Sequence, residues 1–173
     1  MNPHHIALPN EDSSTIRDRT SHLRYPFLES EAALDDFISG WRTGTLPKSS
    51  WTHGAHVAVA AYLAFDHPAE EALNLTRTGI MHFNTCVGTA NTEDSGYHET
   101  LTRFWSNQIG HVVRAGRFAS RLEAVRHAVE LFGQDRHRHC LFYTFDVVKD
   151  RRARREWVVP DRLPITPPAS TNA

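Results

Sequence analysis

The chain has 173 residues, 40% of them hydrophobic and 23% charged, which suits one domain with its own apolar core. Its net charge of -1 supplies no overall field that would attract nucleic acid or a membrane surface, so neither is expected as a partner. Two cysteines do not make a disulfide framework, and no apolar run approaches the length of a membrane span. Because the polar residues 1–18 do not resemble a signal peptide, we expect a soluble, cytoplasmic protein.

The charges are unevenly distributed along the chain. Acidic side chains are in excess before residue 114, and basic side chains are in excess from Arg114 onward. The basic C-terminal third could face an anionic partner, or it could pair with the acidic first part of the chain within the fold. Of these two interpretations we favour pairing within the fold.

The sequence divides into three parts. Residues 1–25 are polar and lack periodicity, which predicts a flexible N-terminal arm. Residues 26–159 carry helical patterns and are expected to form one bundle domain. The proline-rich residues 160–173 predict an extended C-terminal tail.

The first two predicted helices have clear boundaries. Ser30 is a suitable N-cap for a helix over residues 31–42, where apolar side chains recur at three- and four-residue spacing, and Gly44 ends it. Thr52 can cap a second helix over residues 53–65.

The later helices follow the same rules. Asp66 and Pro68 mark the start of a third helix that reaches about Phe83, and a polar, glycine-containing loop separates it from a fourth helix over residues 97–114. The capping box from Ser120 to Glu123 starts a fifth helix that ends at Phe132.

The segment after the fifth helix is less regular. Residues 137–148 are aromatic and β-branched, and fit either a helix or an irregular buried stretch. Asp150 can cap a short basic helix that reaches Trp157. The expected fold is therefore all-α, a single-domain bundle of five to six helices with extended N- and C-terminal arms.

Two short histidine motifs open the second and fourth predicted helices. They are Trp-Thr-His-Gly-Ala-His at residues 51–56 and Gly-Tyr-His-Glu-Thr at residues 96–100. In an up-and-down bundle these two helices run parallel, so their N-termini share one end of the molecule. We therefore expect His53, His56 and His98 to converge, with His82, Asn84 and the segment 137–139 arriving at the same end.

This convergence predicts a mononuclear metal site. His53 and His56 are three residues apart, so their imidazoles project to one side of the helix and can share an ion with His98. Glu99 would be a fourth ligand or a general base, although it could instead form a surface ion pair with Arg103. Tyr97 could donate a proton or a hydrogen bond.

Two local features bear on this site. The small residues Gly54, Ala55 and Ala58 are expected to leave room for a ligand. Two helix N-termini carry partial positive charge, which disfavours a cation but keeps the imidazoles neutral and able to ligate. A carboxylate or an anionic substrate would balance that field.

Five sequence words resemble those of a family of small bacterial helical proteins whose activity is not known to us. They are Thr-Leu-Pro at 45–47, Trp-Thr-His-Gly-Ala-His-Val at 51–57, Asn-Thr at 91–92, Gly-Tyr-His-Glu-Thr-Leu-Thr at 96–102 and Trp-Val-Val-Pro-Asp at 157–161. The resemblance spans residues 27–163 and implies a grouping without a mechanism. More loosely, three histidines at one end of a bundle resemble the metal-dependent DinB-type enzymes, with different motif spacing.

The leading expectation is a metal-dependent enzyme acting on a small molecule, with His53, His56, His98 and Glu99 around iron, copper or zinc. An oxidoreductase is preferred over a hydrolase or a lyase, because nitrogen ligands with one carboxylate suit iron or copper. The alternatives are a metal-free acid–base enzyme using His98, Glu99 and Tyr97, and a non-catalytic ligand-binding or interaction module. Formation of a homodimer is left open.

Overall fold

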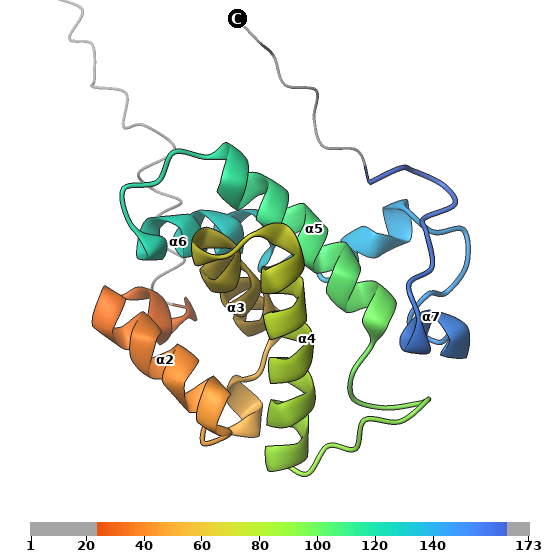
Figure 1. Cartoon of the computed structure of the whole chain (residues 1–173), viewed down its shortest axis with the longest axis horizontal. Helices are drawn as coiled ribbons and strands as arrows, with labels where there is room; N and C mark the ends of the chain where they lie inside the picture. The colour runs from red at the N-terminus through yellow and green to blue at the C-terminus, as the bar shows by residue number, and fades with distance from the viewer. Residues whose placement is uncertain (1–23, 166–173) are drawn as a thin grey trace, which may run out of the picture.

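The computed structural model describes residues 24–165, and within them the chain is all-α, as the sequence predicts. These residues form six α-helices, with short 3-10 helices between some of them. Figure 1 shows how the α-helices are arranged in one bundle. In chain order the elements are η1 (Pro26–Leu28), α2 (Glu31–Thr43), η2 (Lys48–Ser50), α3 (His53–Asp66), α4 (Ala69–Cys86), α5 (Glu99–Ala115), α6 (Arg121–Phe132), η3 (Arg138–Leu141) and α7 (Arg151–Arg155).

Side-chain caps set the starts of most helices, and the predicted caps Ser30, Thr52, Ser120 and Asp150 are confirmed. Asp66 was wrongly expected to open the next helix: it is the last residue of α3, and α4 begins after Pro68 without a side-chain cap. The hydroxyl of Ser30 accepts the Ala33 N–H at the start of α2, and that of Thr52 accepts the Ala55 N–H at the start of α3. α6 and α7 begin in the same way, and their capping residues are Ser120 and Asp150. Each cap satisfies a backbone donor that has no partner inside its own helix.

α3 is the central helix of the bundle. It packs against α4, α5 and α6, and Figure 1 shows it behind α4 in the middle of the molecule. Its small residues serve helix packing and do not make room for a ligand as expected. Ala55 and Ala58 are fully buried in the core, and a Cβ on Gly54 would lie 2.3 Å from Cζ of Tyr25. Small side chains let the neighbouring elements approach α3 closely.

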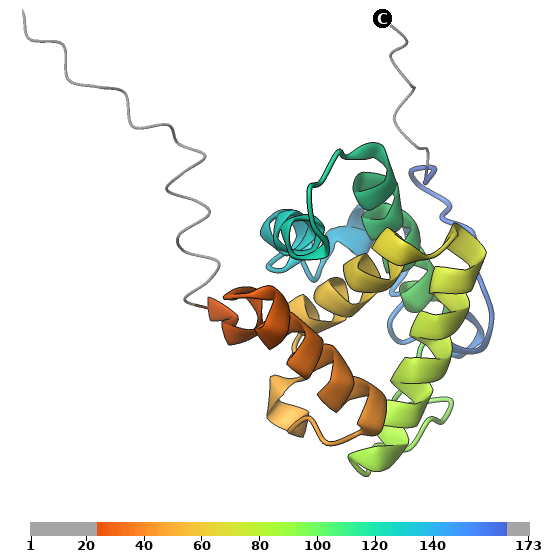
Figure 2. The ribbon, with the colours of Figure 1, turned by 60° about the vertical axis from the view of Figure 1, so that its left-hand side comes forward.

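The C-terminal ends of α2 and α4 lie side by side, as Figure 2 shows at the lower edge of the bundle. At this point Gly44 has a positive φ of 73° and ends α2 in the left-handed conformation. A Cβ there would lie 2.4 Å from Cβ of Cys86, at the end of α4. Glycine is therefore required twice over, by the backbone angle and by the close approach of α4.

Most of the expected arms lies outside the described residues, and the parts inside them are packed. Tyr25 is only 9% exposed, and its hydroxyl donates to the carbonyl of Gly133. In the tail, the Arg162 N–H donates to the carbonyl of Phe142, and Asp161 accepts from the N–H and hydroxyl of Thr144. The bundle therefore includes residues on both sides of the expected domain limits of 26 and 159.

The basic α7 pairs with acidic residues in the loop that precedes α5. Arg151 binds Asp94 at 2.9 Å, and Arg155 binds Glu93 at 2.5 Å. Arg154 donates to the carbonyls of Gly96 and Tyr97 in the same loop. The excess positive charge here is thus balanced within the fold, which is the interpretation favoured from the sequence. No helix among residues 24–165 is long and apolar enough to cross a membrane.

Candidate functional site

A cavity of about 620 Å³ lies between α3, α4 and α5 and is completed by the segment around η3. This volume is within the usual range for small-molecule sites. Each helix presents residues at three- or four-residue spacing to the cavity. They are His53, His56 and Ala60 on α3, Thr76, Ile80 and Asn84 on α4, and the pairs Leu101/Trp105 and Thr102/Ser106 on α5.

Five histidines line this cavity: His53, His56, His98, His137 and His139. The two histidine motifs thus reach the same cavity wall, because the N-termini of α3 and α5 and the C-terminal part of α4 meet there. The end of α6 also arrives at this point, where Nε2 of His53 lies 3.1 Å from the carbonyl oxygen of Phe132. The two histidine motifs therefore meet at one cavity, as the alternation of helix directions in a bundle predicts.

His98 is held by the backbone on both sides of its ring. It is the N-cap of α5, one residue before the helix, and not part of the first turn as the sequence predicts. Its Nδ1 accepts the Leu101 N–H at 3.3 Å, and its Nε2 donates to the carbonyl of Val147 at 2.9 Å. Accepting at one nitrogen and donating at the other requires a neutral ring. Neither nitrogen is free to bind a metal or to move a proton.

Glu99 does not line the cavity. Its carboxylate forms two hydrogen bonds with Arg77 on α4, at 2.6 and 2.9 Å, and not the expected surface pair with Arg103. The Tyr97 hydroxyl donates to the same carboxylate at 2.6 Å. The hydrogen bonds from Arg77 hold the pKa of Glu99 below its usual value. This arrangement joins α4 to α5, and it leaves Glu99 unsuited to the role of ligand or general base predicted from the sequence.

Tyr97 lines the cavity but is a poor proton donor. Burial and the hydrogen bond to Glu99 raise the pKa of its hydroxyl well above the usual value. The proton therefore stays on the phenol oxygen and is shared with the carboxylate. Of the three residues expected to perform acid–base chemistry, Tyr97, His98 and Glu99, none has a free reactive group in the cavity.

His56 is the cavity histidine with an open ring. Its imidazole lies against Trp51, with the ring centroids 4.0 Å apart and the planes tilted by 40°, and it has no hydrogen-bond partner among residues 24–165. Burial lowers its pKa to about 3, and the neighbouring His53 adds to this effect. Burial also lowers the pKa of His53, partly offset by the contact with Phe132. Both rings are therefore neutral at pH 7.

Two further buried polar atoms in this cavity lack partners within the described chain. They are Oγ of Ser106 on α5 and Nδ1 of His139 in η3. His139 is only 7% exposed, and burial lowers its pKa. Buried polar groups are almost always hydrogen-bonded, so two such atoms facing one cavity indicate that a ligand or water completes them. The sequence analysis named the segment of His139 but not Ser106, which lies one turn beyond Thr102 on the cavity face of α5.

The other histidines among residues 24–165 do not line the cavity. His82 is exposed, and its Nε2 lies 3.5 Å from Sγ of Cys86, so it does not join the cavity as expected. His67 pairs with Glu71 at the other end of α4, and His111 lies far along α5. Among residues 24–165, no group of three or more His, Cys, Asp and Glu side chains is placed to hold a metal ion.

A larger groove of about 1260 Å³ runs beside the C-terminal half of α5 and the segment 157–165. Its outer wall contains strongly exposed side chains, such as Val159. The buried Nε of Arg138 lacks a partner there, but this side chain is 35% exposed and Nη1 reaches Asp135. We regard the smaller cavity as the candidate site, because it gathers both histidine motifs and two buried polar atoms without partners.

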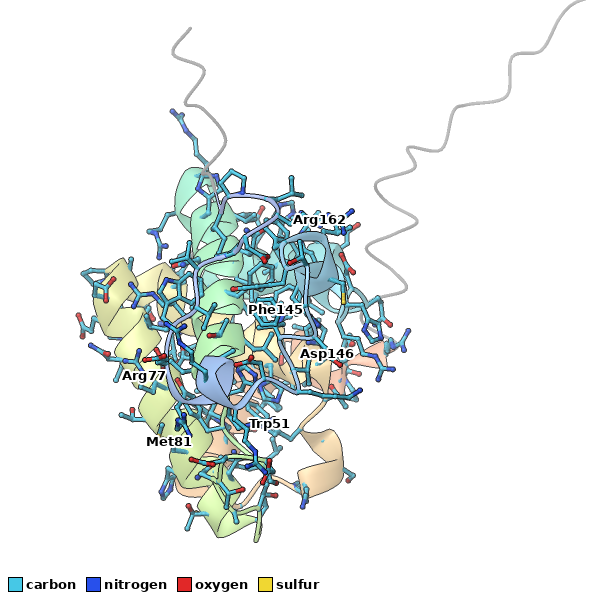
Figure 3. The ribbon with its side chains drawn as sticks, turned by 90° about the vertical axis from the view of Figure 1, so that its right-hand side faces the viewer. Trp51, Arg77, Met81, Phe145, Asp146 and Arg162 are labelled. Atoms are coloured by element: carbon cyan, nitrogen blue, oxygen red, sulfur yellow. The ribbon has the colours of Figure 1, made fainter. Side chains whose placement is uncertain are left out.

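Figure 3 views the molecule from the α7 side. Arg77 and Met81 on α4 appear on one side of Trp51, and Phe145 and Asp146 appear on the other. Trp51 lines the cavity between these two parts of the chain. No protein-family model, curated protein or solved structure matches this chain.

Proposed function

We propose that this chain binds a small molecule with an aromatic or apolar body in the histidine cavity, and that neutral His56 accepts a hydrogen bond from it. The observation that carries the proposal is the convergence of three groups on one cavity. Oγ of Ser106 and Nδ1 of His139 are buried without a hydrogen-bond partner in the described chain, and the half-buried ring of His56 has no hydrogen bond either. Trp51 and Trp105 line the same cavity and offer flat apolar surfaces.

The low pKa of His56 favours binding over general-base catalysis. A base is most effective when its pKa lies near the working pH, and a pKa of about 3 is far below neutrality. A neutral imidazole is nevertheless a good hydrogen-bond acceptor and donor. His56 thus suits a binding role in the free protein, and it becomes a competent base only if a ligand raises its pKa.

The variant His56→Phe tests this proposal. Because the ring of His56 has no hydrogen bond to lose, we expect the variant to be at least as stable as the wild type in urea at pH 7. Ligands found by thermal shift and tryptophan fluorescence with the wild type should bind about tenfold or more weakly to it. The matched control is His127→Phe, since His127 is exposed and lies outside the cavity.

A clear loss of stability in His56→Phe with unchanged ligand affinity would contradict the proposal. It would assign His56 a purely structural role. A screen of small aromatic and apolar molecules without any ligand for the wild type would also contradict it.

Metal binding is a second candidate, favoured by one specific observation. His53 and His56 lie one turn apart on the cavity wall, and both rings are neutral at pH 7. Nδ1 of His139 lines the same cavity without a partner, but among residues 24–165 these three rings are not placed to share one ion, so a metal held by all three would require them to move. Neutral imidazoles suit zinc, copper or iron. Since Glu99 is bound to Arg77, the preference for an oxidoreductase now rests on nitrogen ligands alone.

Elemental analysis of protein purified without a histidine tag tests the metal candidate. Near-stoichiometric metal that is lost in His53→Ala and in His56→Ala, but retained in His127→Ala, would support it. If the wild-type protein contains no metal, even after anaerobic reconstitution, the metal candidate is excluded and the proposal of a metal-free small-molecule site stands.

A further inference from the structure

The ionisable side chains of the cavity wall are all basic or weakly acidic. Lys48 and Arg136 stand at its rim, five histidines and Tyr97 line it, and no aspartate or glutamate side chain belongs to the wall. The nearest acidic groups that act on the histidines are Asp135, beside His53 and His139, and Asp146, beside His139. Both lie outside the wall, whose permanently charged side chains are the basic Lys48 and Arg136.

Two helix N-termini add to this positive charge. α3 begins at His53 and α5 is capped by His98, and both residues line the cavity. The N-terminus of an α-helix carries partial positive charge and attracts anions. Among the described residues no carboxylate lines the cavity. Glu99, in the first turn of α5, complements that helix end from outside the cavity, where it binds Arg77, whereas α3 has no acidic side chain in its first turn.

An unpartnered buried group marks the position of the missing partner. His139 is more than nine-tenths buried and lines the cavity, and its Nδ1 has no hydrogen-bond partner among the described residues. Close by along the chain, the exposed Arg136 uses Nε for His137, at 2.9 Å, and its other two guanidinium nitrogens remain open. An anionic oxygen could accept hydrogen bonds from His139 and Arg136 and offset the charge of Arg136.

We infer that the ligand of this cavity is a small organic acid, with an aromatic or apolar body beside Trp51 and Trp105 and an anionic oxygen group toward His139 and Arg136. The inference rests on the proposed small-molecule site and specifies the class of its ligand. Carboxylates and phosphate monoesters share the required chemistry.

Matched ligand pairs test the inference by isothermal titration calorimetry. The probes are a panel of aromatic carboxylates, the corresponding primary amides, phenyl phosphate and inorganic phosphate. We expect the acids to bind at least about tenfold more tightly than their amides. Tighter binding of phenyl phosphate than of benzoate would identify a phosphate monoester as the ligand class, and the reverse order would identify a carboxylate.

The variants Arg136→Gln and His139→Leu locate the anionic group. Arg136 is exposed, so its replacement is expected to leave the fold intact, even if the buried His139→Leu fails to fold. Arg136→Gln should weaken the binding of the acids about tenfold and leave the affinity for the amides unchanged. The control Arg117→Gln removes an exposed charge outside the cavity and should change neither.

The outcomes separate the two levels of the proposal. If acids and amides bind with equal affinity, and His56→Phe weakens the binding of both, the inference of an anionic ligand is wrong and the small-molecule site stands. Binding of acids that is insensitive to Arg136→Gln and His139→Leu would overturn the inference as well. Failure of every acid, amide and neutral aromatic probe to bind would overturn both.

Discussion

The imidazole of His56 links ligand binding to the pH dependence of stability. Its pKa is lowered from 6.5 to about 3 in the folded chain, mainly by burial. Between these two values the unfolded chain binds more protons than the folded chain, so the free energy of unfolding falls as the pH is lowered through this window. Above pH 6.5 the ring is neutral in both the folded and the unfolded chain, so it no longer lowers the free energy of unfolding.

The variant His56→Phe should therefore flatten the pH profile. We expect the slope of unfolding free energy against pH to fall by up to about 1.4 kcal/mol per pH unit between pH 6 and pH 4. Urea unfolding at several pH values measures this slope, with the exposed His127→Phe as the control. An unchanged slope would mean that the ring of His56 is solvated in the free protein.

Glu99 has a structural role that a neutral variant can reveal. Its side chain is 13% exposed and is bound by Arg77 and Tyr97, so Glu99→Gln weakens a charge-assisted pair and leaves the guanidinium of Arg77 without its charged partner. We expect a loss of about 1–3 kcal/mol of stability in urea. Ligand affinity should stay unchanged, because the carboxylate does not line the cavity. The control Glu70→Gln changes an exposed residue in the first turn of α4.

A loss of ligand affinity in Glu99→Gln, with stability retained, would restore the sequence-based interpretation of Glu99 as a ligand or base.

The ion pair of Glu99 with Arg77 also makes stability depend on pH under acid conditions. Since the pKa of Glu99 is lowered in the folded chain, the stability that this carboxylate contributes is present above the pKa of the unfolded chain and is lost as the pH falls through its folded value.

At the level of secondary structure, His98 determines how α5 begins. As an N-cap it satisfies the Leu101 N–H, and its other nitrogen fixes the carbonyl of Val147. Asparagine is a good N-cap but is too short to replace the second contact in the same way. We expect His98→Ala to cost about 1–3 kcal/mol in urea and His98→Asn to recover the capping part of that loss.

Equal losses for the two variants would show that the contact with Val147, and not the cap, accounts for the contribution of His98. Binding of a metal that disappears in His98→Asn, with stability unchanged, would instead support the ligand role predicted from the sequence.

Local rules allowed the helices to be predicted, because each has its own signals. Ser30, Thr52, Ser120 and Asp150 are all caps in the structure, and Gly44 ends α2 as expected. The alternation of helix direction then brought the two histidine motifs to one cavity. These features depend on nearest neighbours in the chain and on helix periodicity, which a single sequence contains.

The roles of individual site residues depend on tertiary partners that no local pattern specifies. The partner of Glu99 is Arg77 on another helix, and the second partner of His98 is a carbonyl 49 residues away, at Val147. The segment that carries His139 has a single 3-10 turn, so no periodicity could indicate which side chains point inward. The sequence therefore predicted that the two histidine motifs would meet, but not the partners of their side chains.

At the scale of the whole molecule, the cavity depends on the enclosure of α3 by elements from both ends of the chain. α3 is apolar on all sides, with ten of its fourteen residues buried, so it requires neighbours all round. On the outer side of α5, a second small core contains Phe104, Phe142, Tyr143 and Val147. This second core positions the segment from which His139 and Val148 face the cavity.

One buried hydroxyl joins this C-terminal part to the bundle. Thr100 on α5 donates to the carbonyl of Glu156 at 2.7 Å and accepts the Val158 N–H at 3.0 Å. Thr100→Val keeps the shape of the side chain but leaves both backbone groups without this partner, so we expect a loss of about 1–3 kcal/mol in urea. Amide hydrogen exchange at Val158 should speed up more than exchange within α3. The control is Thr78→Val, an exposed threonine whose hydroxyl bonds only within α4. The same segment carries part of the cavity wall, so we also expect weaker ligand binding in Thr100→Val. Equal acceleration of amide exchange in all helices would show instead that the C-terminal part unfolds only together with the bundle.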